Sequence, residues 1–579
     1  MIKKAILLVL SIIVSATYPL SAFAYSGNGA GSVGDPYRIY TCTQLQEMRD
    51  NLTSNFRIEQ DVDCTSMTTW EPVGFYSGTP FTGTLDGQGY GIYNLTYDGD
   101  GPAGVFGYTN GASVSNLSVI SGDIAAAGTA GGVIGDATNT TISHVSTLNT
   151  TIRSSYAIGG LVGIADTVTI SDSAVYNTTV TTPAVAPFAN NFGGLIGQST
   201  GSTVDRTSVS GVVTSNSTLS SSGLGGFIGD SQGDTIRDSY SSAAVTGSSN
   251  VGGFIGNGTS SSVDNSYASG AVTGNSNVGG MVGYEGLMGI TQSFSTGLVT
   301  GNTSVGGFIG HAVAAGTTLT DSTWDITRSG ITDCVGLDES ISFAATCTGV
   351  NTASAQPNYF FNNTTNSPLD QWNFSSIWQT TSTLPILITT PDRVDNVSVV
   401  RTSSSLTVRW EVPANTGGSP ITSYDLQYRP SSALTSTRVT GLPNSNPSTY
   451  TISGLSASTE YIVEIRGHNA NGVGIWSGFI TTTTAPVAVA VVPTTPKTST
   501  STPSIISTAT ESVTEEMAPV STPVSTNNTT TKSHEEINDC CAETPTNNLP
   551  TILWISGGVI VGVGGLIWLL RVLASRRPL

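Results

Sequence analysis

The sequence predicts an all-β protein whose largest part is a parallel β-helix, a solenoid built from stacked coils. Three observations predict it. A glycine phrase recurs at a nearly constant spacing, short apolar bursts of about five residues alternate with Gly, Ser, Asn and Asp, and no segment of the repeat region has the 3.6-residue apolar period of a helix. Only 10% of the residues are charged, while glycine alone numbers 67.

The glycine phrase defines the repeat. Successive glycine pairs are separated by 28, 34, 32, 27, 27 and 27 residues, which is the pattern of a solenoid with insertions of variable length. The copies are GGVIG at 131–135, GGLVG at 159–163, GGLIG at 193–197, GGFIG at 225–229, GGFIG at 252–256, GGMVG at 279–283 and GGFIG at 306–310.

Stacking explains why the phrase repeats. One coil cannot bury its apolar side alone, so equivalent residues of successive coils are expected to form ladders at about 4.8 Å spacing. About nine coils then give a rod of about 40 Å. The first expected ladder is Val133, Leu161, Leu195, Phe227, Phe254, Met281 and Phe308, and the second is Ile134, Val162, Ile196, Ile228, Ile255, Val282 and Ile309.

The two ends of the rod carry their own signals. Residues 25–100 are expected to hold an N-terminal cap and the first coils, residues 101–325 the repeats, and residues 326–388 a C-terminal cap. The segment TCTQLQEMRD reads as a short capping helix with Thr43 as its N-cap. Tryptophans are expected to cap the ends of the apolar column, namely Trp70, Trp324, Trp372 and Trp378.

Six cysteines fit an oxidising exterior. Two couples are expected to form disulfides that close short loops at the ends of the repeat region, Cys42 with Cys64 and Cys334 with Cys347. The adjacent Cys540 and Cys541 could link chains or be incidental.

The repeat phrases resemble the Glug-motif repeats of bacterial surface proteins over about residues 30–388. The resemblance rests on the G-G-hydrophobic-Ile/Val-G phrase and on NSYASGAVTG, which follows it at 265–274. FTGTLDGQGYGIYNLTY at 81–97 is similar to the opening of such regions, and DSTWDITRSGITDCVGL at 321–337 is similar to their close. The resemblance implies a surface-exposed solenoid.

Residues 389–485 follow a different pattern, with strands of alternating polarity separated by turns. This stretch resembles a fibronectin type III domain. The resemblance implies a β-sandwich in which Trp410 is the core tryptophan and Tyr461 the corner tyrosine.

The flanking segments predict export and anchoring. Residues 1–24 read as a signal peptide, residues 486–548 as a disordered stalk rich in Pro, Ser and Thr, and residues 551–570 as a transmembrane helix. Arginines in the tail at 571–579 place that tail in the cytoplasm. We therefore expect a single-pass protein of the cell surface, with its N-terminus outside.

The net charge and the positions of the histidines and aspartates exclude several classes of function. A net charge of −19 argues against nucleic-acid binding. The four histidines share no metal-ligand spacing, so we expect no metal, cofactor or catalytic residues. Scattered aspartates are read as turn residues rather than as a glycosidase pair, namely Asp205, Asp234, Asp238, Asp264 and Asp321.

These features predict a non-enzymatic surface protein, an adhesin that presents its rod to an unknown ligand on a cell, matrix or glycan. Two alternatives stay open. One is a β-helix that binds or degrades polysaccharide, which a groove lined with acidic and aromatic residues would favour. The other is a structural component of the envelope, which would associate with itself.

Overall fold

The computed structural model describes residues 25–486, apart from 76–77, 184–187, 218–219, 314–315, 340–344, 354–355, 395, 414, 434–435, 446–447 and 478–479. No helix among the described residues is long and apolar enough to cross a membrane. The expected signal peptide, the transmembrane helix, the tail and nearly all of the stalk, with Cys540 and Cys541, lie outside the described residues.

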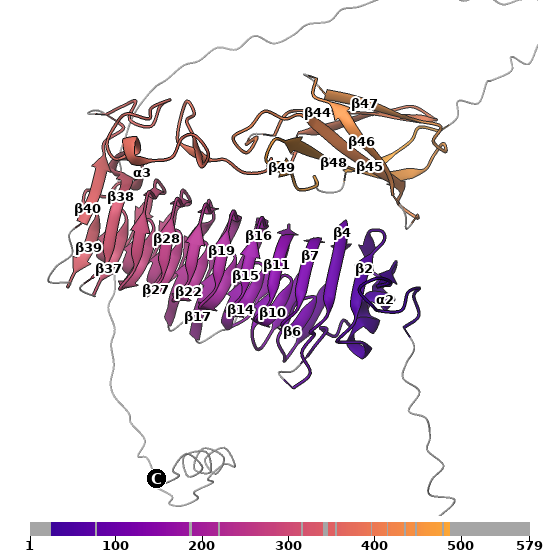
Figure 1. Cartoon of the computed structure of the whole chain (residues 1–579), viewed down its shortest axis with the longest axis horizontal. Helices are drawn as coiled ribbons and strands as arrows, with labels where there is room; N and C mark the ends of the chain where they lie inside the picture. The colour runs from indigo at the N-terminus through magenta and orange to yellow at the C-terminus, as the bar shows by residue number, and fades with distance from the viewer. Residues whose placement is uncertain are drawn as a thin grey trace, which may run out of the picture. The chain divides into compact units, whose positions relative to one another are not determined.

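Residues 37–350 form a parallel β-solenoid with three sheets (Figure 1). One coil runs through the three sheets in turn, so that each strand pairs with its counterpart about 27 residues away. The nine-stranded sheet contains β6(Phe106–Asn110), β10(Ile134–Thr138), β14(Val162–Asp166), β18(Ile196–Thr200), β22(Ile228–Gln232), β27(Ile255–Thr259), β32(Val282–Gly286), β37(Ile309–Ala312) and β39(Val335–Asp338). The seven-stranded sheet contains β9(Ala130–Gly131), β13(Tyr156–Gly159), β17(Phe188–Gly193), β21(Ser220–Gly225), β26(Ser249–Gly252), β31(Ser276–Gly279) and β36(Thr303–Gly306).

The third sheet has 24 strands because each coil contributes several short ones, and we call it the large sheet. Its strands are β1(Tyr37–Ile39), β2(Asn55–Ile58), β3(Val62–Asp63), β4(Thr84–Tyr93), β5(Thr96–Gly99), β7(Ser113–Ile120), β8(Asp123–Ala126), β11(Thr141–Leu148), β12(Thr151–Arg153), β15(Thr169–Ser171), β16(Ala174–Thr181), β19(Thr203–Asp205), β20(Ser208–Thr214), β23(Thr235–Arg237), β24(Tyr240–Ser241), β25(Ala244–Thr246), β28(Ser262–Asp264), β29(Tyr267–Ala268), β30(Val272–Thr273), β33(Gly289–Thr291), β34(Phe294–Ser295), β35(Val299–Thr300), β38(Thr318–Asp325) and β40(Ala345–Val350).

The two predicted ladders form the interior of the rod. The ladder from Ile134 to Ile309 is continuous in the strand register of the nine-stranded sheet. The ladder from Val133 to Phe308 is linked by backbone hydrogen bonds of 2.8–3.0 Å between successive members. Every member of both ladders is buried. Neighbours in the sequence both point inward because the chain turns a corner between the two sheets at the glycine phrase.

The glycine pair is required by close backbone approach. A Cβ on Gly252 would lie 1.9 Å from the carbonyl oxygen of Ile255, and one on Gly253 would lie 2.3 Å from that of Gly280. Any side chain at these positions would push the corner open or separate two coils. The repeated pair thus lets the chain turn tightly and lets the coils stack.

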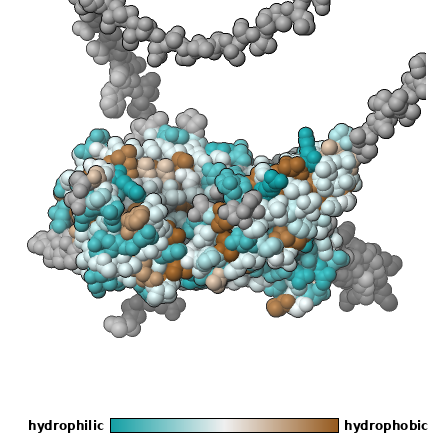
Figure 2. Space-filling model, turned by 90° about the horizontal axis from the view of Figure 1, so that it is seen from above, coloured by the Kyte–Doolittle hydropathy of each residue, from teal (hydrophilic) through white to brown (hydrophobic). Residues whose placement is uncertain are grey.

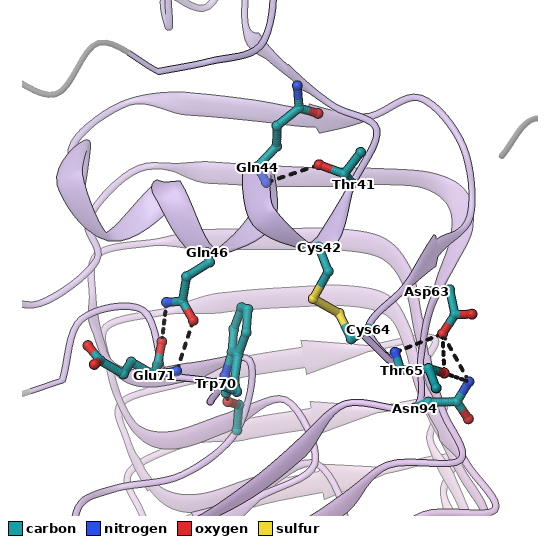
Figure 3. Close-up of a disulfide and its surroundings, with 11 residues drawn as sticks. Thr41, Cys42, Gln44, Gln46, Asp63, Cys64, Thr65, Trp70, Glu71 and Asn94 are labelled. Carbon is teal, nitrogen blue, oxygen red and sulfur yellow. Dashed lines mark hydrogen bonds between the residues drawn. A yellow bond between two sulfur atoms is a disulfide. The ribbon is translucent and has the colours of Figure 1, made fainter. Parts of the chain in front are cut away.

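The N-terminal end is closed by α2(Cys42–Gln46) and the 3-10 helix η1(Glu47–Asp50). Thr41 is the N-cap of α2, and its hydroxyl accepts a hydrogen bond from Gln44 N at 3.2 Å (Figure 3). The expectation that Thr43 is the cap was wrong. The helix starts two residues earlier, and the side chain of Gln44, three residues after Thr41, accepts from Tyr40 N at 2.8 Å, one residue before the cap.

Disulfide bonds join Cys42 to Cys64 and Cys334 to Cys347, with Cα–Cα distances of 5.2 and 6.4 Å. These are the couples expected from the sequence. The first ties α2 to the segment after β3 (Figure 3), and the second ties the chain before β39 to β40. Trp70 lies near the first bond in the interior cluster and donates from Nε1 to Gly104 O at 3.0 Å.

The tryptophan prediction holds for two of the four residues. Trp70 and Trp324 are buried in the interior cluster near its two ends. Trp372 and Trp378 belong to a different cluster, which packs on the outer face of the large sheet, so the expectation that they cap the column was wrong. They follow the last coil, α3(Ile326–Ser329) and the 3-10 helix η2(Leu369–Gln371), where the chain folds back with the short pair β41(Trp378–Gln379) and β42(Ile386–Leu387).

Residues 397–483 form an antiparallel β-sandwich. Trp410 is buried in its core against Tyr424, at a centroid distance of 5.4 Å, and the hydroxyl of Tyr461 accepts from Ser456 N at 3.1 Å, which is the geometry of a tyrosine corner. The strands are β43(Val397–Arg401), β44(Ser405–Trp410) and β47(Ser448–Ser453) in one sheet, and β45(Ser423–Pro430), β46(Thr437–Pro443), β48(Glu460–Asn469), β49(Gly472–Val473) and β50(Ile480–Thr483) in the other.

Candidate functional site: the seam between solenoid and sandwich

The solenoid and the sandwich belong to one compact unit of the chain. Side chains of β4 and of the loop before β3 contact the sandwich sheet that contains β45, β46 and β48. Trp476 donates from Nε1 to Gly89 O at 2.9 Å, and Ser436 donates from Oγ to Asp61 Oδ2 at 3.3 Å. We call this contact the seam.

The centre of the seam is a buried cluster of ionisable groups. Asp61, Arg429 and Glu464 are 2%, 5% and 1% exposed. Arg429 Nε lies 3.7 Å from Asp61 Oδ2. Glu464 accepts from the hydroxyl of Tyr93 at 2.8 Å and from Nε2 of Gln427 at 2.6 Å. The cluster thus holds two carboxyl groups, of which one is ion-paired and the other accepts hydrogen bonds from neutral donors.

Burial dominates the electrostatics of this cluster. It raises the pKa of Glu464 to about 8, with a further contribution from the neighbouring charge of Asp61. Burial also raises the pKa of Asp61 and, together with Glu464, the pKa of the Tyr93 hydroxyl. A protonated Glu464 is therefore the favoured form at neutral pH.

Guanidinium groups stacked on aromatic rings surround the cluster. Arg438 lies 5.1 Å from the ring centroids of both Tyr90 and Trp476, and Arg466 lies 4.4 Å from that of Trp476. Farther along the solenoid, Arg393 lies 4.2 Å from the ring centroid of Tyr176. The contacts with Tyr90 and Tyr176 hold planar cations against rings of the solenoid, whereas those with Trp476 lie within the sandwich.

A groove runs beside the cluster along one corner of the solenoid. It consists of two pockets of about 490 and 230 Å³ that share Asp172, Thr390 and Ile475 in their walls. Polar residues of the solenoid and of the sandwich face each other across it. Besides the shared residues, the walls include Asn116, His144, Tyr176, Arg206, Ser208, Tyr240, Asp392, Arg466, Asn471 and Trp476.

The corner beside the groove consists of residues in the left-handed conformation. His144, Asp172 and Arg206 have φ of 54°, 50° and 46° and follow one another at successive coils. Asn and Asp adopt this conformation most readily among residues with a side chain. The repeated corner explains why short polar residues recur there and why their side chains line the same edge of the rod.

Ion pairing fixes the charge of the main groove carboxylate. Arg206 donates to Asp172 through Nε at 2.7 Å and through Nη2 at 2.9 Å, and it also bonds Asp205. Although burial raises the pKa of Asp172, the hydrogen bonds and the charge of Arg206 leave it below its usual value. Asp172 is therefore a carboxylate, and a general acid of the glycosidase type would need a raised pKa.

The other aspartates singled out from the sequence do not converge on the groove. Asp238 and Asp321 occupy the left-handed corner of later coils, each with φ of 48°, which agrees with the turn role expected for them. Asp234 is buried and accepts hydrogen bonds from the side chains of Ser199 and Ser231 at 3.0 and 2.6 Å. Asp205 and Asp264 lie in the same row of the large sheet, separated by Arg237.

Sequence reasoning missed the seam altogether. Tyr93 and Glu464 are 371 residues apart, and each sits in a strand whose pattern is ordinary for its own module. The available signal was weak, an apolar residue at the outer position of successive coils at Tyr93, Ile120 and Leu148. Among the described residues, no group of three or more His, Cys, Asp or Glu side chains is arranged to hold a metal ion.

Comparisons with known proteins identify the second module. Residues 392–483 match the family model of the fibronectin type III domain. A stretch of 98 residues, 15% of this chain, is 37% identical to Halomucin of Haloquadratum walsbyi, and the chain spans about 1% of the length of that protein. Domains A168–A170 of titin share 25% identity over 17% of this chain and 35% of that structure, with a TM-score of 0.16.

A putative immunoglobulin A1 protease from Bacteroides ovatus is also similar. It shares 18% identity over 62% of this chain and 94% of that structure, with a TM-score of 0.35. A likeness at this level carries no argument about function. The chain therefore contains a fibronectin type III domain, which follows a parallel β-solenoid.

Proposed function

We propose that this protein is a non-enzymatic protein of the cell surface that makes contacts of the adhesion type through the groove between solenoid and sandwich. The proposal joins the all-β architecture to the sequence features of export and anchoring. A rigid solenoid carrying a fibronectin type III domain suits the presentation of a binding surface away from the membrane. The assignment of the repeats to the Glug-motif group and the single-pass topology are parts of the same proposal.

The observation that carries the proposal is the composition of the groove. Hydroxyl, amide, carboxylate and guanidinium groups of two modules face one another, which supplies donors and acceptors together. Such a lining matches the hydroxyl groups of a glycan chain, and we take a glycan as the ligand class. The hydropathy of the surface supports this choice, because the face in Figure 2 is mostly hydrophilic with only scattered hydrophobic residues.

The electrostatics of the groove supports binding rather than hydrolysis. A glycosidase needs two carboxyl groups across the cleaved bond, one of them with a raised pKa. The groove carboxylate Asp172 is held ionised by Arg206. Glu464, whose pKa is raised to about 8, is buried in the seam and is 1% exposed.

Glycan binding by the purified full chain tests the proposal. We expect the chain to bind a subset of glycans on an array and to release no oligosaccharide from them. Arg206→Ala should abolish binding because it frees Asp172 and removes a groove cation. Arg237→Ala is the matched control, since Arg237 lies on the adjacent strand of the large sheet outside the groove lining, and it should leave binding intact.

Three outcomes contradict the proposal in different ways. Release of oligosaccharide would favour a polysaccharide-degrading enzyme. Equal loss of binding in both variants would show that the groove is not the glycan-binding site. Ordered self-association without glycan binding would favour a structural envelope component.

A further inference from the structure

We propose that the seam is a pH-dependent latch, which holds the fibronectin type III domain on the solenoid most tightly in acidic solution and weakens steadily as the pH rises to mildly alkaline values. The latch is a property of the interface between two modules of one chain. It does not depend on the groove binding a glycan.

The geometry places an unpaired acid where it cannot be solvated. Glu464 lies at the centre of β48 and points into the seam, where it is 1% exposed. Its two oxygens accept from Tyr93 of the solenoid and from Gln427 of β45, and both donors are neutral. Ionising this carboxyl in place would bury a second negative charge beside Asp61, with the one cation Arg429 shared between the two carboxyl groups, which is costly.

The groups packed around Glu464 do not neutralise an ionised carboxylate at that position. On the solenoid side these are Tyr93 and the second carboxyl group, Asp61. On the sandwich side they are Gln427 and Arg429 of β45, and Arg429 is the cation paired with Asp61. Arg438 of β46 donates to Oε1 of Gln427 at 3.1 Å and so meets Glu464 only through that amide.

Releasing the sandwich removes the penalty. In the undocked state Glu464 faces water, far from Asp61, and its pKa returns toward the ordinary value of 4.5, whereas it is about 8 in the docked state. Between these two values the docked state binds one proton more than the undocked state. The docking constant therefore falls about tenfold for each pH unit as the pH rises from about 4.5 to about 8.

The sign follows from the raised pKa. The advantage of the docked state that comes from the Glu464 proton is fully present below about pH 4.5, and it is lost as the pH rises through about 8. Asp61 shifts in the same direction because burial raises its pKa as well. Alkaline solution thus exposes the solenoid surface that the sandwich covers.

Fluorescence energy transfer between the modules tests the latch in the full chain. Dyes are placed by Val400→Cys on the sandwich and Leu298→Cys on the solenoid, two positions that are 55% and 56% exposed. Cys540 and Cys541 are changed to serine, and the other four native cysteines are disulfide-bonded. Transfer efficiency is then followed from pH 5 to pH 9.5 at constant ionic strength.

We expect the docking constant to decrease with rising pH, at about tenfold per unit below pH 8. Glu464→Gln keeps the shape of the side chain and one acceptor oxygen but cannot ionise, so it should flatten the dependence. Glu460→Gln is the control, because Glu460 is exposed on the same strand and should leave the dependence unchanged. Asp61→Asn, a second variant on the solenoid side, should make the fall end at lower pH, because the charge of Asp61 raises the pKa of Glu464.

Two results would overturn the latch. One is a pH dependence that survives in Glu464→Gln with the slope of the parent chain. The other is a transfer efficiency that stays constant across the pH range in the parent chain. Circular dichroism at each pH separates undocking from unfolding, since undocking leaves both β-rich modules intact.

Discussion

The outer face of the large sheet is covered in two different ways along its length. Over the later coils, Tyr240, Tyr267 and Phe294 stack in register at centroid distances of 4.8 Å, and Trp372 and Trp378 pack on them. We call this the aromatic cover. Over the earlier coils, a row of residues in register from Tyr93 to Tyr176 lies apart from the interior cluster, and the contacts from the sandwich to it are polar or cationic.

The difference shows how one sheet can bind one segment at every pH and another segment only in a limited pH range. The aromatic cover gains its energy from apolar area and ring contacts, which do not depend on pH. The seam gains part of its energy from ionisable groups that are satisfied in only one protonation state. The aromatic cover should therefore behave as part of the solenoid, whereas the sandwich should behave as a module that can be released.

The largest effect is expected from Trp378→Ala in the aromatic cover. Trp378 is fully buried and contacts the rings of Tyr267, Phe294 and Trp372, so its truncation should cost about 3–5 kcal/mol of stability. The loss should be equal at pH 6 and pH 9. Urea denaturation followed by tryptophan fluorescence measures it. Phe361→Ala, at a residue 48% exposed, is the control and should cost less than about 0.5 kcal/mol.

Arg429→Met should weaken docking nearly as much, by about 3–5 kcal/mol at pH 8, because it leaves Asp61 buried without its cation. The loss should shrink at pH 5, where protonation neutralises the carboxyl groups. The fall in docking with pH should also become steeper, since two protons are then needed. Energy transfer between the modules reports both quantities, and a loss independent of pH would show that Arg429 acts only by packing.

Tyr93→Phe should have a smaller effect. The substitution keeps the ring in the row and removes the hydroxyl that donates to Glu464, so docking should weaken by about 1–3 kcal/mol. The interior of the solenoid should be unaffected, which thermal unfolding of the solenoid checks. Tyr450→Phe on β47, in the sandwich sheet that does not contain β48, serves as the matched control.

The smallest expected effect comes from Tyr267→Leu in the aromatic cover. Leucine retains most of the apolar contact but loses stacking with Tyr240 and Phe294, which is worth about 0.5–1.5 kcal/mol. Thermal unfolding at two pH values measures the change. A loss of stability that depends on pH would contradict the claim that the aromatic cover, unlike the seam, is independent of pH.

Much of the solenoid could be predicted from the sequence because every coil needs the same residue types at the same positions. In a phrase such as GGFIG, the glycine pair marks a corner of the coil that only glycine fits. The Phe and Ile that follow the pair mark the two ladders to which the coil contributes. Trp410 and Tyr461 marked the sandwich in the same way, through local spacing. Local patterns also explain the error at the N-terminal cap, where Thr41 and Thr43 are both plausible until the side-chain hydrogen bonds of Thr41 and Gln44 are seen.

The seam could not be predicted because nothing local encodes it. Glu464 and Arg429 occupy outward positions of sandwich strands, where a charged residue is ordinary, and only the docked solenoid buries them. Trp378 shows the same limit. Its sequence suggested a cap, but whether it closes the end of the rod or covers a face depends on the path of residues 351–387.

The central claim is that the two covers of one sheet respond differently to pH, and hydroxyl-radical footprinting tests it within a single sample. Side-chain oxidation of Tyr93 and Tyr176 reports the seam, and that of Tyr267 and Trp378 reports the aromatic cover. From pH 6 to pH 9.5 we expect oxidation of the first pair to rise severalfold while the second pair stays protected. Equal protection of both pairs at pH 9.5, or their simultaneous exposure, would contradict the account.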